Sequence, residues 1–130
     1  MSKRSTPRPA VPSTDKTILI VDDDQEFREA LVEILRSEGY QVEAATTGLQ
    51  AIDKLRWGLR PCLILLDMQM GVMTGWDFRS EQKRDPTLAA IPVIAMTAGY
   101  WKDRDLSDYA ARITKPIDVK DLQAKLAQYC

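Results

Sequence analysis

Residues 63–75, LILLDMQMGVMTG, carry the clearest indication of the fold. Four apolar residues, Leu63 to Leu66, lead directly to one acidic residue, Asp67, and a loop with two glycines follows. An apolar run of this length, between Pro61 and a glycine-containing turn, is typical of a strand buried on both faces. Such strands occur in parallel sheets that helices cover on each side. Ligands bind at the carboxyl ends of strands in open α/β sheets, so this pattern makes Asp67 a candidate functional residue.

Asp67 by itself leaves two interpretations open. An acidic residue behind a strand can carry chemistry, or it can simply accept hydrogen bonds from the backbone of the turn that follows. The rest of the chain decides between them, because a functional edge needs other polar groups at the ends of neighbouring strands.

The composition is that of an ordinary globular protein of one domain. The chain has 130 residues, of which 45% are hydrophobic and 28% charged, and its net charge is −1. This balance gives no support to nucleic-acid binding or to binding of an anionic membrane. The chain has no histidine, which excludes Ser-His-Asp and Cys-His catalysis and histidine metal sites. Carboxylates, lysine and hydroxyl groups remain to carry any chemistry.

The two cysteines, Cys62 and Cys130, are too few for a disulfide framework. Cys62 opens a buried strand and is interpreted as a small core residue, and Cys130 is the last residue. The sequence has no secretory leader and no long apolar span, so we expect a cytoplasmic protein that does not bind a membrane. In that compartment both thiols are expected to be reduced.

Strand-like and helix-like segments alternate from residue 16 onward. Short apolar runs predict five strands, at 17–21, 40–45, 62–66, 91–97 and 111–114. Helical spacing predicts the helices, at 24–39, 48–58, 75–85 and 118–129, with a short polar helix at 102–110. Asp24 and Asp118 stand where N-caps are needed. Such alternation predicts an α/β fold, a doubly wound sheet of five parallel strands with helices on both faces.

Residues 1–15 differ from the rest of the chain. They hold three of the seven prolines, are polar and basic, and show no periodicity. This composition is typical of a flexible tail, and the folded domain is expected to cover residues 16–130.

Polar side chains stand at the carboxyl ends of four predicted strands. They are Asp22, Asp23 and Asp24 after the first strand, Asp67 after the third, Thr97 on the fourth and Lys115 after the fifth. Parallel strands bring these ends to one edge, where carboxylates without histidine suit Mg²⁺. A lysine and a hydroxyl beside them can hold phosphoryl oxygens. The group predicts that Asp67 accepts a phosphoryl group as an acyl phosphate.

From about Thr17 to Gln128, the chain resembles the receiver domain of bacterial two-component response regulators. The pieces that carry the resemblance are ILIVDDD (18–24), LILLDMQM (63–70), Gly75, PVIAMTA (92–98) and TKP (114–116). The resemblance implies a flavodoxin-like sheet in the order 2-1-3-4-5 and a stand-alone, chemotaxis-regulator-like receiver. It implies a signalling domain rather than an enzyme, capable at most of self-phosphorylation and slow self-dephosphorylation.

The resemblance also implies a role for each acidic residue. Asp67 is expected to be the phosphoacceptor, which takes the phosphoryl group from a sensor histidine kinase or a histidine phosphotransfer protein. Asp22, Asp23 and Asp67 are expected to bind Mg²⁺ together with the backbone carbonyl of Gln69.

Two further residues complete the expected site. Thr97 is the expected switch hydroxyl, and Lys115 is expected to pair with the phosphate, with a cis bond before Pro116. The expected output is docking to a downstream protein target, by a monomer or weak dimer that binds no nucleic acid.

The sequence departs from the family at the positions that transmit the signal. Met70-Gly71 stands where the family usually has Met-Pro, and Arg112 stands where it usually has an aromatic residue. The short polar segment that precedes the fifth strand supplies few core residues. We therefore expect the phosphorylation signal to appear as a conformational change around the fourth helix, at residues 99–110, with Arg112 at the surface.

Two other functions fit parts of the sequence. The Asp-x-Asp of Asp22 and Asp24 is similar to that of haloacid-dehalogenase-type phosphohydrolases, but Glu26 replaces their threonine, no cap domain fits, and Asp67 would have no role. A receiver-fold interaction scaffold without phosphorylation would need none of the five groups of the site. The phosphoacceptor receiver explains all of them.

Overall fold

The computed structural model describes residues 17–98 and 106–130. The predicted tail at 1–15 and part of the predicted helix at 102–110 lie outside these residues. The proposed domain boundary at residue 16 therefore stays a prediction.

Strands and helices alternate along the described chain. In order they are β1 (Thr17–Val21), α1 (Gln25–Ser37), β2 (Gln41–Ala45), α2 (Gly48–Arg56), β3 (Leu63–Asp67), α3 (Gly75–Arg84), β4 (Val93–Thr97), β5 (Ala111–Thr114) and α4 (Val119–Tyr129). All strand pairs are parallel, and the sheet order is β2-β1-β3-β4-β5. The predicted doubly wound fold and strand order are confirmed.

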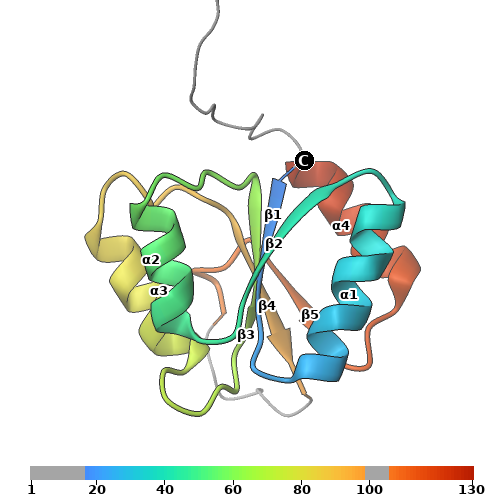
Figure 1. Cartoon of the computed structure of the whole chain (residues 1–130), viewed down its shortest axis with the longest axis horizontal. Helices are drawn as coiled ribbons and strands as arrows, with labels where there is room; N and C mark the ends of the chain where they lie inside the picture. Colours follow the sequence, from blue (N-terminus) through green and yellow to red (C-terminus); the bar gives the residue numbers. More distant parts are fainter. Residues whose placement is uncertain (1–16, 99–105) are drawn as a thin grey trace, which may run out of the picture.

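The sheet separates two helical layers. Figure 1 shows the sheet edge-on, with α2 and α3 on one side and α1 and α4 on the other. The central strands β1, β3 and β4 are buried along their whole length, whereas the edge strands β2 and β5 alternate between buried and exposed residues. This difference explains why the central strands have continuous apolar sequences, since helices cover both of their faces.

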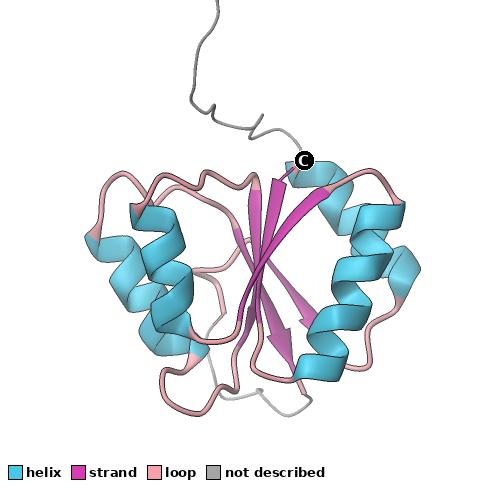
Figure 2. Cartoon of the chain, viewed as in Figure 1, coloured by secondary structure: helices cyan, strands magenta, loops and turns pink. Residues whose placement is uncertain are grey.

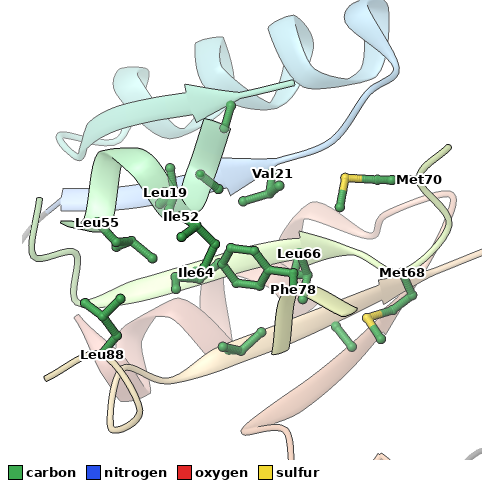
Figure 3. Close-up of a cluster of buried hydrophobic side chains, with 14 of the residues drawn as sticks. Leu19, Val21, Ile52, Leu55, Ile64, Leu66, Met68, Met70, Phe78 and Leu88 are labelled. Carbon is green, nitrogen blue, oxygen red and sulfur yellow. The ribbon is translucent and has the colours of Figure 1, made fainter. Parts of the chain in front are cut away.

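Each layer has its own apolar core. Successive residues of a strand point to opposite faces, so Leu19 packs with α2 and α3, and Ile18 with α1 and α4. Figure 3 shows the first core, in which the ring of Phe78 from α3 lies among aliphatic side chains of the sheet and α2. No helix in the described part of the chain is long and apolar enough to cross a membrane.

The predicted helix caps are confirmed. The Asp24 carboxylate accepts a hydrogen bond from the Phe27 N–H at the start of α1. The Asp118 carboxylate accepts from the Lys120 and Asp121 N–H groups at the start of α4. Each carboxylate satisfies backbone donors that have no partner within the helix.

The described part of the predicted fourth helix, residues 106–110, forms turns instead of a helix. Two side chains hold it against α3. The Tyr109 ring packs edge-to-face on Trp76 with the ring centroids 5.8 Å apart, and the Asp108 carboxylate lies 2.8 Å from the Lys83 ammonium. These contacts fix the described segment directly before β5 against α3.

The expectation of two reduced thiols is wrong for this structure. Cys62, directly before β3, and Cys130, directly after α4, form a disulfide with their Cα atoms 5.6 Å apart. The amino end of β3 and the carboxyl end of α4 meet at the same edge of the sheet. The two cysteines are 68 positions apart in the chain, so only the fold brings them together.

Candidate functional site

The predicted site residues gather at the carboxyl edge of the sheet, toward which the arrowheads of β4 and β5 point in Figure 2. Asp67 and Thr97 are the last residues of β3 and β4, and Asp22 directly follows β1. All three are buried, although they are polar. Buried polar groups need partners, so their contacts define what the site can bind.

An acidic cluster occupies this edge. Each of Asp22, Asp23 and Asp67 has a carboxylate oxygen at this edge, and the three oxygens lie within 4.8 Å of one another. Asp23 is exposed, and its carboxylate accepts a hydrogen bond from the Gly71 N–H at 3.2 Å. Asp24 is not part of the cluster, because its carboxylate caps α1. Three converging carboxylates are a hard-oxygen set of the kind that binds Mg²⁺.

Lys115 brings a positive charge into the cluster from the end of β5. Its ammonium lies 2.9 Å from Asp22 Oδ2 and 3.8 Å from Asp67 Oδ1. Its backbone N–H donates to the Thr97 carbonyl at 2.7 Å, and the peptide bond to Pro116 is cis, as predicted. The lysine therefore contacts two of the three carboxylates.

The pKa of the Asp67 carboxyl is raised above its usual value. Burial raises its pKa to about 6, and the negative charges of Asp22 and Asp23 act in the same direction. The Gln69 N–H, which donates to Asp67 Oδ1 at 3.0 Å, and the Lys115 charge lower the pKa and partly offset this effect. At neutral pH the group is mainly an ionised and poorly solvated carboxylate, which favours its reaction as a nucleophile.

Thr97 brings a buried hydroxyl group to the site. It is buried, and within residues 17–98 and 106–130 no hydrogen-bond partner contacts its Oγ1. A buried hydroxyl in this condition is uncommon, since most find an acceptor or donor in the protein. It is therefore available to donate to an oxygen that arrives at the site.

Gly75 permits α3 to begin against the end of β3. A Cβ atom at this position would lie 2.8 Å from Met68 Cα and 2.9 Å from the Asp67 carbonyl oxygen, both of which are backbone atoms. At Gly71, a Cβ would meet only the Asp23 carboxylate, at 4.0 Å. Close approach thus requires glycine at 75 but not at 71.

Two other predicted residues lie where expected. Arg112 is exposed on the edge strand β5, which confirms its predicted place at the surface. Gln69 lies two residues after the end of β3, and its backbone N–H donates a hydrogen bond to the Asp67 carboxylate. Binding of a metal by its carbonyl stays a prediction.

The fold and this edge define a receiver. The receiver domain of response regulators matches residues 18–127, so the chain belongs to that family. It is a phosphoacceptor receiver domain.

Three comparisons illustrate the relationship. The chain is 33% identical to the polar-differentiation response regulator DivK of Brucella anthropi, over 80% of this chain and 87% of DivK. It is also 33% identical to the DNA-binding regulator RpaA of Synechocystis, but there it spans only 46% of the relative. Among solved structures, TrrA of Thermotoga maritima in complex with Mg²⁺-BeF is 30% identical, with a TM-score of 0.77 over 88% of this chain and 99% of TrrA.

Proposed function

We propose that Asp67 is the phosphoacceptor and that the donor is a phosphohistidine on a histidine kinase or a phosphotransfer protein. The observation that carries this proposal is the placement of the buried Asp67 carboxylate beside the Lys115 ammonium, at 3.8 Å, and the acidic pair. An Asp67 oxygen forms a bond to phosphorus as the bond from phosphorus to the imidazole nitrogen breaks. The imidazole leaves with the electron pair and takes a proton from water.

Asp22, Asp23 and Asp67 are the side chains proposed to hold Mg²⁺, with the Gln69 carbonyl as a further ligand. The donor set fits, because it consists of hard oxygens with no nitrogen or sulfur ligand. When bound, Mg²⁺ supplies positive charge that neutralises the carboxylates and the phosphoryl oxygens. The structure of TrrA with Mg²⁺-BeF supports the assignment by analogy.

Lys115 and Thr97 are proposed to bind the transferred group. The Lys115 ammonium is within reach of an oxygen on Asp67, and the Thr97 hydroxyl has no partner in the described parts of the chain. Together they would hold two anionic phosphoryl oxygens by charge-assisted hydrogen bonds, one from an ammonium and one from a hydroxyl group. Their movement toward the phosphoryl group would start the conformational signal.

The proposal for the downstream step, docking of a protein target, is less detailed. The predicted output segment, residues 99–110, lies partly outside the described residues, and its described part is held on α3 by Asp108 and Tyr109. Docking of a protein target there, by a monomeric or weakly dimeric cytoplasmic receiver, stays a prediction.

Labelling tests the proposed function directly. With acetyl phosphate and Mg²⁺, the wild type should gain one phosphoryl group that hydroxylamine removes, since an acyl phosphate reacts with that nucleophile. Borohydride reduction followed by peptide mass spectrometry should place the group on Asp67. Labelling in EDTA at the same rate, or a group mapped to Asp22, would refute the proposal.

Melting curves test the proposed metal ligands. Millimolar Mg²⁺ should raise the melting temperature of the wild type by several degrees, because binding to the folded state stabilises it and relieves repulsion in the cluster. Asp23→Asn should lose most of this rise. Asp24→Asn is the matched control, because asparagine also caps helices and residue 24 is outside the cluster. Equal loss in both variants would show that the roles of these two acids are assigned wrongly.

A further inference from the structure

In addition to its two carboxylates, the Lys115 ammonium contacts an aromatic ring. It lies over the ring of Phe27, 4.1 Å from the ring centroid, in cation–π geometry. Phe27 belongs to the first turn of α1, and Lys115 to the loop after β5. Both side chains line an apolar groove between α1 and α4, together with Ile34 and Pro116.

Hydrogen bonds connect Phe27 to the same acid that pairs with the lysine. Asp22 Oδ1 accepts from the Asp24 N–H at 2.9 Å, and Asp24 Oδ1 accepts from the Phe27 N–H at 3.2 Å. The Phe27 ring contacts the Lys115 ammonium, and this ammonium donates a hydrogen bond to Asp22 Oδ2 at 2.9 Å. The four residues thus form a closed chain of contacts that fixes the ring relative to the ammonium.

We propose that Phe27 is a positioning residue that keeps the Lys115 ammonium at the site while its anionic partner changes from Asp22 to the phosphoryl group on Asp67. The proposal rests on the proposed function. A divalent cation at the acidic cluster shares the charge of Asp22 and weakens its attraction for Lys115. The face of an aromatic ring attracts a cation but carries no net charge, so it can hold the ammonium without competing with a phosphoryl oxygen.

Nuclear magnetic resonance of the wild type tests the contact itself. Protons over an aromatic face are shifted upfield, so the Lys115 ε-methylene resonances should lie upfield of those of the other lysines. The shift should persist with Mg²⁺ and beryllofluoride and should vanish in Phe27→Leu. Ordinary lysine shifts in the wild type, or loss of the shift with beryllofluoride, would overturn the proposal. The two spectra of the wild type, with and without Mg²⁺ and beryllofluoride, require neither phosphoryl transfer nor a variant, so they decide even if Phe27→Leu does not fold.

Rates of labelling by acetyl phosphate test the consequence. Phe27→Leu keeps an apolar side chain but removes the ring, and its rate should fall about three- to tenfold. Phe27→Tyr keeps the ring and should stay within about twofold of the wild type. Ile34→Val is the matched control, because Ile34 lines the same groove seven positions along α1. Equal rates for the leucine and tyrosine variants would overturn the proposal, whereas an unlabelled wild type would refute the proposed function instead.

Discussion

An Asp67→Asn variant should take up no phosphoryl group, and in EDTA at neutral pH it should melt at a higher temperature than the wild type. Loss of labelling follows because the amide is no nucleophile toward phosphorus. The gain in stability follows from the raised pKa of Asp67, about 6 in the folded protein against a usual value of 3.8. A carboxyl with a raised pKa destabilises the folded state whenever it is ionised.

Because the pKa of Asp67 is raised in the folded state, the gain in stability of Asp67→Asn is confined to a defined pH range. The folded state binds the proton more tightly, so the cost of the ionised Asp67 is fully present above about pH 6 and disappears as the pH falls through 6 toward 3.8. A shift of this size corresponds to roughly 1–3 kcal/mol. Denaturant melts of Asp67→Asn and the wild type should therefore differ most at pH 7.5 and converge near pH 4.

A control separates this effect from the simple removal of a negative charge. Asp53 is exposed on α2, so Asp53→Asn removes one charge without touching the site. Its free energy of unfolding should stay within about 0.5 kcal/mol of the wild type. If Asp67→Asn is no more stable than Asp53→Asn at pH 7.5, ionised Asp67 does not destabilise the folded state as its raised pKa implies.

Reduction of the disulfide should lower the stability of the protein by up to about 4 kcal/mol. The bond between Cys62 and Cys130 closes a loop with a sequence separation of 68, and a loop of this length removes much conformational entropy from the unfolded chain. Denaturant unfolding with and without a reducing agent measures the difference.

Cys130→Ser is the matched variant for this prediction. It should unfold at the same denaturant concentration with or without the reducing agent and should resemble the reduced wild type. The wild type is unfolded without a reducing agent and its free thiols are counted. Detection of two free thiols would contradict the Cys62–Cys130 disulfide.

The sequence predicted the sheet because its signals are local. The run Leu63 to Leu66 and the β-branched run at 17–21 are buried on both faces, so their apolar pattern is continuous and unambiguous. The site was equally accessible, since parallel strands bring their carboxyl ends together and Asp67 and Thr97 stand at those ends.

Other features depend on contacts between distant parts of the chain. In the sequence, Gln82 is one polar residue among the many charged residues of its helix. In the structure it is fully buried, and its side-chain amide donates to the Leu88 and Ile91 carbonyls at 2.9 and 3.1 Å. The Phe27–Lys115 contact also has no signal in the sequence, because residue 27 has helical spacing that any core residue would share. The Gln82 contacts follow from how the segment after α3 folds back on that helix, and the Phe27–Lys115 contact from how α1 packs beside the loop after β5.

The division of the interior into two cores bears on how such a domain can evolve. Among the described residues, the core under α1 and α4 shares no side chain with the core under α2 and α3, because the buried sheet lies between them. Substitutions far apart and without common partners act nearly independently on stability. Drift or selection on one helical layer can therefore change the surface that meets one partner while the opposite layer keeps its shape. The strand ends that carry Asp22 and Asp67 remain the part that both layers constrain.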